Sequence, residues 1–219
     1  MSLPKSDILE KQDLYFEWSR PEMLEFIPSD VKRVLDVGCA SGAFSADIKR
    51  KFGAEVWGVE VNPAAAAKAA MRLDRVICSA YDSSIDFGDS LFDCIVFNDV
   101  LEHMQYPENA LRLSLDLLSP SGVVVASIPN VRHLSVVWDL AVRGEWEYKE
   151  AGILDDTHLR FFTESSIRRM FRRAGYSVQR CEGINEAIGR KFRLLSLLLG
   201  GKMNGLRHMQ YGVVAVRGS

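Results

Sequence analysis

The sequence predicts an α/β protein built on a doubly wound, mostly parallel sheet. Three observations support this fold class. Apolar, strand-like runs alternate with helical patterns, acidic side chains follow several of those runs, and no repeat or low-complexity segment interrupts them. Asn62-Pro63 and Tyr106-Pro107 mark two helix starts, because proline fits the first turn of a helix. Ligands of such sheets bind beyond the carboxyl ends of the strands, so a binding site is expected there.

The segment Val34 to Phe44 is typical of a buried strand that enters a glycine loop and then a helix. Glycine lets the backbone approach a ligand closely, and the following helix begins with unpaired N–H groups. A dinucleotide fingerprint would need the spacing GxGxxG, whereas here the glycines are Gly38 and Gly42, and Asp36 precedes them. An acid at this point repels a pyrophosphate but suits a ligand that carries an ammonium group.

Further acids follow the next strands in order. Glu60 ends the second predicted strand, about twenty residues beyond the loop, where a ribose-binding carboxylate is expected. Asp82 follows the third strand, and the run Asn98 to His103 follows the fourth. Taken singly, Asp36 or Glu60 fits a helix-capping or surface carboxylate, and Asp82 fits the start of a turn at Asp82-Ser83-Ser84.

The glycine loop resembles the first motif, DxGxGxG, of class I S-adenosylmethionine-dependent methyltransferases, with Ala40 in place of the middle glycine. Asn98 to His103 resembles the fourth motif of that family, and the resemblance spans about Val31 to Val178. It implies a Rossmann-like sheet of seven strands with the last strand antiparallel, S-adenosylmethionine as cofactor, and an N-terminal helix that covers the cofactor. The implied cofactor-binding residues are Asp36, Gly38, Cys39, Gly42, Glu60, Val61, Asp82, Asn98 and Tyr15.

A single domain is expected over 1–219: a cover helix in 1–30, the cofactor-binding core in 31–129, an insertion in 130–162 and the end of the sheet in 163–219. The insertion, Asn130 to Phe162, is too long for an ordinary connection, and we expect a lid or a dimer arm there. The predicted strands are 34–37, 55–59, 75–78, 92–97, 122–128, 176–181 and 210–216. The predicted helices are 43–52, 63–73, 107–118 and 164–174.

Composition agrees with a globular enzyme of cytoplasmic location. The chain has 219 residues, a net charge of −2 and a pI near 6.1, which argues against nucleic acid as a partner. No apolar run reaches the length of a membrane span, and no signal-peptide pattern begins the chain, so stable membrane insertion is not expected. Cys39, Cys78, Cys94 and Cys181 lack CxxC spacing and are expected as reduced core residues.

Asp99, Glu102 and His103 stand at positions i, i+3 and i+4, so a helical turn would put them on one face. Two carboxylates and an imidazole can hold Mg²⁺ or Mn²⁺. The pattern is similar to that of metal-dependent O-methyltransferases of the ubiquinone-biosynthesis and small-RNA 2′-O-methyltransferase families, completed here by His158, with Asp99 in place of glutamate. Related methyltransferases with the same Leu-Glu-His hold no metal. His103, His133 or His158 would then act as the general base.

An oxygen is the expected methyl acceptor, since no Asn-Pro-Pro-Tyr sequence follows the fourth strand. Ile128 to His133 and Asp156 to Thr163 resemble bacterial methyltransferases of polysaccharide and glycosyl-transfer pathways, which implies a sugar, glycolipid or other small hydroxyl compound. A homodimer is a further expectation. Two alternatives remain open: an NAD-dependent oxidoreductase and a catalytically inactive scaffold with the methyltransferase fold. Positive charge and an apolar run meet in Arg190 to Leu199, a pattern that fits a lipid contact, a lid helix or a dimer contact.

Overall fold

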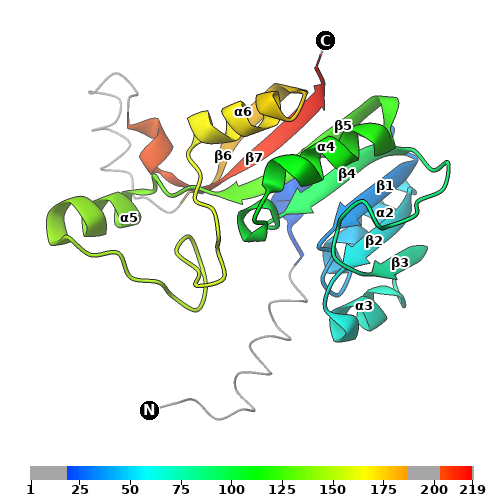
Figure 1. The fold of residues 1–219 in the computed structure, drawn as a ribbon, viewed down its shortest axis with the longest axis horizontal. Helices are drawn as coiled ribbons and strands as arrows, with labels where there is room; N and C mark the ends of the chain where they lie inside the picture. Colours follow the sequence, from blue (N-terminus) through cyan, green and yellow to red (C-terminus); the bar gives the residue numbers. More distant parts are fainter. Residues whose placement is uncertain (1–18, 187–202, 219) are drawn as a thin grey trace. The chain divides into compact units, whose positions relative to one another are not determined.

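A computed structural model describes residues 19–186 and 203–218 (Figure 1). Seven strands form a mixed sheet in the order β3-β2-β1-β4-β5-β7-β6. The chain divides into two compact units. Unit 1 comprises Met1–Phe97 and Asp116–Val123, and unit 2 comprises Asn98–Leu115 and Val124–Ser219, each as far as the structure describes it.

Unit 1 holds the parallel strands β1 (Arg33–Val37), β2 (Glu55–Glu60) and β3 (Arg75–Cys78), and β4 (Phe92–Asn98) up to Phe97. Val37 of β1 lies beside Val59 of β2 and Phe97 of β4, so these parallel strands end at one edge. Residues on both faces of β1 and β4 are buried, which explains their continuous apolar runs. The helical elements of unit 1 are η1 (Pro21–Glu25), α2 (Ala43–Phe52) and α3 (Pro63–Ala69).

Unit 2 is built on the antiparallel pair β6 (Tyr176–Glu186) and β7 (His208–Arg217). Helix α6 (Glu164–Arg173) begins at a capping box in which Thr163 and Ser166 satisfy each other's backbone N–H groups. The 3₁₀ turn η2 (Leu101–His103) follows β4 directly, and η4 (Asn204–Leu206) precedes β7. Further elements are α4 (Pro107–Leu117) and β5 (Leu118–Pro129), which both units share, and α5 (Leu134–Trp138) and the π-helix η3 (Asp139–Arg143).

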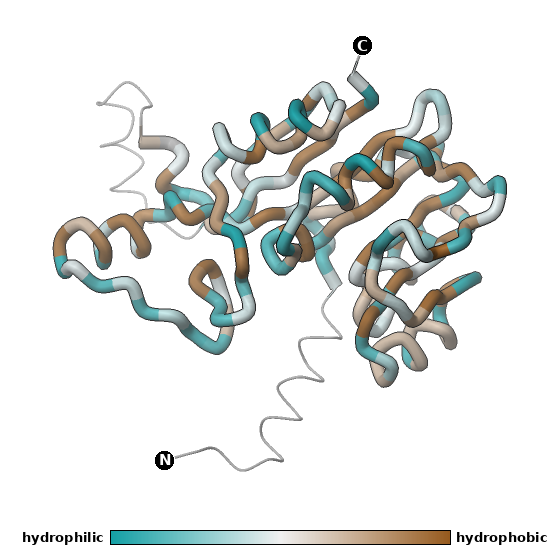
Figure 2. The backbone as a smooth tube through the Cα atoms, in the orientation of Figure 1, coloured by the Kyte–Doolittle hydropathy of each residue, from teal (hydrophilic) through white to brown (hydrophobic). Residues whose placement is uncertain are grey.

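The structure confirms the predicted fold class, with seven strands and an antiparallel last strand. Apolar residues are concentrated along the strands (Figure 2). Helix α3 ends at Ala69 instead of Leu73, because Asp74 turns the chain back to β2: its backbone N–H donates to Val56 O, and its carboxylate accepts from Val56 N. Strand β5 begins earlier than expected, at Leu118.

The predicted N-terminal cover helix lies largely outside the described residues, with Tyr15 and Trp18. Its described end forms the 3₁₀ helix η1, which is followed by the buried Phe26. The apolar run within Arg190 to Leu199 also lies outside them. Among the helices that are described, none is long and apolar enough to cross a membrane. Three of the cysteines are buried as expected, but Cys78 is exposed.

The two glycines that flank α2 offer a matched test of packing at the glycine loop. Gly42 and Gly53 both have left-handed backbones, with φ of 78° and 66°. A Cβ at Gly42 would lie 3.2 Å from Ala69 Cα, whereas nothing lies within 4 Å of one at Gly53. Gly53→Ala should lower the free energy of unfolding by about 1 kcal/mol through backbone strain alone. Gly42→Ala should cost roughly 1 to 3 kcal/mol more, because it also overpacks the contact with α3.

Urea unfolding curves of the two variants measure this difference. Equal losses of stability would show that Gly42 is needed only for its backbone conformation and not for the close approach of α3.

Candidate functional site

Three residues of the glycine loop in unit 1 have a left-handed backbone conformation. Gly38, Ala40 and Gly42 have φ of 72°, 49° and 78°. Gly38 N and Cys39 N both donate to Val59 O, at 2.7 and 3.2 Å, so the loop is held against the end of β2. The left-handed backbone of Ala40 explains why glycine stands at this position in the motif that the loop resembles.

Glu60 ties the same loop to the start of α3. Its side chain is only 6% exposed, and its two carboxylate oxygens accept from Ala40 N at 2.9 Å and Asn62 N at 2.8 Å. Asn62 in turn caps α3 by accepting from Ala64 N and Ala65 N. The end of β2 therefore places a fixed carboxylate directly beside the glycine loop.

Asp36 lies within the same electronegative region. Its carboxyl is 3% exposed and accepts a hydrogen bond from Ser45 Oγ of α2. The pKa of Asp36 is raised to about 7: burial is the largest cause, the Ser45 hydrogen bond opposes it, and the charge of Glu60 adds a smaller increase. The pKa of the Cys39 thiol is also raised, first by burial and then by Asp36 and Glu60. A cationic ligand would relieve this concentration of negative charge.

The remaining predicted cofactor residues differ in their surroundings. Val61 is 69% exposed directly after Glu60. Asp82 is exposed and accepts from Ser84 N and Ser84 Oγ, so it does start the turn that was the alternative interpretation, and these hydrogen bonds lower its pKa. The buried side-chain amide of Asn98 has no hydrogen-bond partner among residues 19–186 and 203–218. Its amide is thus suited to a polar ligand group.

A second cluster lies in unit 2. Glu102, His103 and His158 each offer one ligand atom, and these atoms lie within 4.8 Å of one another. Backbone hydrogen bonds hold the cluster together, since Glu102 O accepts from Leu159 N at 2.9 Å and from Arg160 N at 3.0 Å. The insertion residues 153–160 are therefore fixed to η2, as the pairing of His103 with His158 in the sequence analysis required.

Both imidazoles of this cluster use their Nδ1 atoms on the protein. His158 Nδ1 lies 3.1 Å from Ile153 O, a carbonyl to which it must donate. His103 Nδ1 lies 3.1 Å from Thr157 Oγ1, whose own proton is donated to Asp155. With both Nδ1 atoms protonated, the two Nε2 atoms carry lone pairs. Histidines that bind metals are oriented by this kind of hydrogen bond.

The electrostatics of His158 agree with a neutral imidazole. Burial lowers its pKa below the ordinary range, and His103 lowers it further, while the hydrogen bond to Ile153 O opposes them. The two rings meet edge to face with centroids 4.7 Å apart. Two imidazoles next to the buried Glu102 carboxylate can hold a divalent cation, or one of them can accept a proton.

Two predicted residues have other contacts. Asp99 is outside the group of three, and its Oδ1 accepts from Ser127 Oγ at 3.0 Å and Gln210 Nε2 at 2.8 Å. His133 caps α5 by accepting from Ser135 N, and it too is outside the group. Thr157 and Gln210 were missed in the sequence analysis. Thr157 directly precedes His158, a position that signals a supporting role, whereas Gln210 has no local signal.

Comparisons with known proteins assign the family. A model of the methyltransferase domain matches residues 15–180. The chain belongs to the methyltransferase family. It is a class I S-adenosylmethionine-dependent methyltransferase and therefore an enzyme.

Curated relatives include two ubiquinone biosynthesis O-methyltransferases. That of Chromobacterium violaceum is 30% identical over 181 residues, 75% of this chain and 74% of the relative. That of Alkalilimnicola ehrlichii is 27% identical over 189 residues, 82% of this chain and 74% of the relative.

Solved structures share the fold of this methyltransferase. An S-adenosylmethionine-dependent methyltransferase from Archaeoglobus fulgidus matches with a TM-score of 0.68 at 18% identity, covering 97% of this chain and 99% of that one. The plantazolicin methyltransferase BpumL, solved with S-adenosylhomocysteine, matches with a TM-score of 0.64 at 13% identity, covering 96% and 90%.

The raised pKa of Asp36 predicts a pH-dependent affinity for the cofactor product S-adenosylhomocysteine. The ammonium group of this ligand favours the ionised carboxylate, so binding requires loss of the Asp36 proton once the pH is below about 7. Affinity measured by calorimetry should be constant above that pH and fall by up to about tenfold for each unit below it. Asp36→Asn should bind more weakly with a flat profile, and an unchanged profile in that variant would assign the titration to another group.

Glu60 is predicted to hold the cofactor ribose, with Glu55 at the other end of the same strand as a matched control. Glu60→Ala should weaken cofactor binding about tenfold to a hundredfold, since a hydrogen bond to a charged group contributes roughly 1.5 to 3 kcal/mol. Glu55→Ala removes contacts to Arg33 and Trp57 only and should bind as the wild type does. Equal affinities of the two variants would exclude Glu60 from the site.

Proposed function

We propose that this methyltransferase transfers the methyl group of S-adenosylmethionine to a hydroxyl oxygen of a small molecule. In this reaction the methyl carbon breaks its bond to the sulfonium sulfur and bonds to oxygen, and the hydroxyl loses its proton. The enzyme must therefore align the acceptor. It must also either accept the hydroxyl proton or lower the pKa of the hydroxyl. The single observation that carries the proposal is the cluster of Glu102, His103 and His158, in which Nδ1 of both rings is hydrogen-bonded to the protein.

These residues fit a divalent cation. Glu102 offers a carboxylate oxygen and the two histidines offer Nε2, while their Nδ1 atoms are held by Thr157 and by Ile153 O. Two imidazoles and one carboxylate suit Mn²⁺ better than Mg²⁺, which prefers oxygen ligands. When bound, the cation would lower the pKa of a hydroxyl that it contacts. The three side chains would hold the cation next to the turn that follows β4.

A flat acceptor is supported by the aromatic residues around His158. Phe161 lies 6.3 Å from the His158 ring, and its ring centroid lies 5.3 Å from Trp146 and 6.1 Å from Tyr148. Trp146 and Tyr148 are 38% and 52% exposed, so their faces are accessible to a ligand. The names of the curated relatives favour a hydroxyl of a quinone precursor over the sugar hydroxyl of the sequence analysis.

Methyl transfer should depend on the cation and on His158. With a hydroxylated quinone precursor as acceptor, release of S-adenosylhomocysteine should stop on addition of a chelator and return with Mn²⁺. His158→Ala should abolish the response to Mn²⁺ and leave cofactor affinity unchanged, because the change is confined to the metal-binding cluster. His133→Ala, which removes the contacts of His133 Nδ1 to the backbone N–H and hydroxyl of Ser135 at the start of α5, should keep the metal response and serves as the control.

A metal-free reaction would give a different result. Chelation would then have no effect, and the rate would rise with pH through the lowered pKa of His158, reaching its plateau at a lower pH than an ordinary histidine would give. Full activity in each of the two single variants, His103→Ala and His158→Ala, would contradict both mechanisms.

A further inference from the structure

Two strained backbone positions lie at the ends of one hydrogen-bonded chain in unit 2. Asp99 and Asn185 have φ of 53° and 55°. In the described part of the chain, only Ala40 is a third residue other than glycine with positive φ. Asp and Asn adopt left-handed φ more readily than other residues with a side chain, but negative φ is still favoured, so contacts to these side chains help to keep the conformation.

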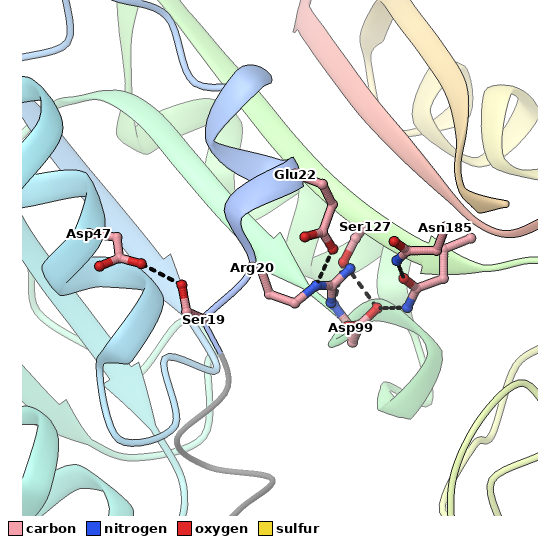
Figure 3. Close-up of polar contacts among 8 residues, drawn as sticks. Ser19, Arg20, Glu22, Asp47, Asp99, Ser127 and Asn185 are labelled. Atoms are coloured by element: carbon pink, nitrogen blue, oxygen red, sulfur yellow. Dashed lines mark hydrogen bonds and ion pairs between the residues drawn. The ribbon is translucent and has the colours of Figure 1, made fainter.

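Several contacts of Asp99 come from strands far away in sequence (Figure 3). Ser127 of β5 donates from Oγ to Asp99 Oδ1 at 3.0 Å, and Asp99 N lies 3.1 Å from the same hydroxyl. Gln210 of β7 donates from Nε2 to Asp99 Oδ1 at 2.8 Å, and Asn185 Nδ2 of β6 donates to Gln210 Oε1 at 2.8 Å.

The directions of these hydrogen bonds require a glutamine at position 210. Because Gln210 must donate to the Asp99 carboxylate, its amide oxygen faces the other way, toward the donor Asn185. A glutamate at this position would oppose the Asp99 carboxylate with a second negative charge. The amide thus connects the end of the β6–β7 pair to the turn that leaves β4.

Asp99 controls the entry of the chain into η2. Asp99 directly follows β4, and Glu102 and His103 lie three and four residues later. The backbone torsions of Asp99 set the direction of the next peptide, so relaxation of φ to a negative value would redirect the turn that carries Glu102 and His103. His158 belongs to a different segment and would not follow that movement.

We propose that Gln210, supported by Asn185, is a positioning residue for the Glu102, His103 and His158 centre. It holds the Asp99 carboxylate together with Ser127, keeps Asp99 in its left-handed conformation, and so keeps His103 next to His158. The positioning of His103 does not depend on the proposed function. Only the assignment of this centre to the methyl acceptor rests on it.

The test compares Gln210→Leu and Asn185→Gly with the control Gln179→Leu. Gln210→Leu removes one donor to the Asp99 carboxylate and leaves that of Ser127 in place. Asn185→Gly removes the donor to Gln210 while suiting the positive φ, so it preserves the fold even where Gln210→Leu does not. Gln179 lies on β6, is exposed, and donates only to Ser177, at 3.4 Å.

The first readout is the imidazole ¹⁵N spectrum, which is simple because the chain has four histidines. Both Gln210→Leu and Asn185→Gly should shift the His103 resonances, and Gln179→Leu should leave them in place. The second readout is Mn²⁺ affinity, which should fall about tenfold in Gln210→Leu, as loss of a supporting partner of a metal site typically does. S-adenosylhomocysteine affinity should stay within about twofold of wild type, because the substitution is outside the cofactor-binding residues.

Unchanged His103 resonances in folded Asn185→Gly and Gln210→Leu would overturn the positioning role, whatever the metal binding. If wild-type protein binds no Mn²⁺ but His103 shifts in both variants, the proposed metal chemistry fails and the positioning role stands. A loss of kcat with unchanged KM for S-adenosylmethionine in Gln210→Leu would further support it, whereas wild-type kcat with shifted His103 resonances would show that the position of His103 does not matter to the reaction.

Discussion

The parallel register of β1 with β2 places two buried carboxylates next to one glycine loop, and we propose that cofactor binding depends on that placement. Asp36 lies on β1 one residue before Val37, and Glu60 follows Val59, the residue opposite Val37. Water would normally screen two such charges from each other. Here both carboxyl groups are buried, and the pKa of Asp36 is raised to about 7, with burial as the largest cause. The sheet thus holds an unfavourable charge distribution that a cationic sulfonium ligand with an ammonium group makes favourable.

The centre in unit 2 follows a different principle. Glu102, His103 and His158 come from η2 and from the insertion, and the backbone of Glu102 fixes the two segments to each other. Acceptors at Ile153 and Thr157 favour the tautomer with the proton on Nδ1 in both rings, which leaves Nε2 available for a cation or a proton. Groups that are already oriented in this way need not reorganise when the reaction takes place. Preorganised polar groups contribute to catalysis for this reason.

Local patterns in the sequence predicted most of the fold and part of the site. The strand runs, the proline helix starts and the glycine loop depend on neighbouring residues, and β1, α2 and β3 lie where these patterns put them. The grouping of His103 with His158 was also predicted, from a family resemblance. The bonds from Ser127 and Gln210 that hold Asp99 could not be predicted, because Gln210 is 111 residues away and nothing near it marks the contact. His133 was offered as a base, yet its cap on α5 depends on the backbone of an insertion whose fold local patterns did not resolve.

Proton release on cofactor binding tests the central electrostatic claim most directly. Calorimetric titration of S-adenosylhomocysteine at about pH 7, in buffers of different ionisation enthalpy, gives the number of protons exchanged. Because Asp36 titrates near that pH and must be ionised beside the ligand's ammonium group, the account predicts release of about half a proton per site, and none in Asp36→Asn. Binding with no proton exchange in the wild type, or equal release in both proteins, would contradict it.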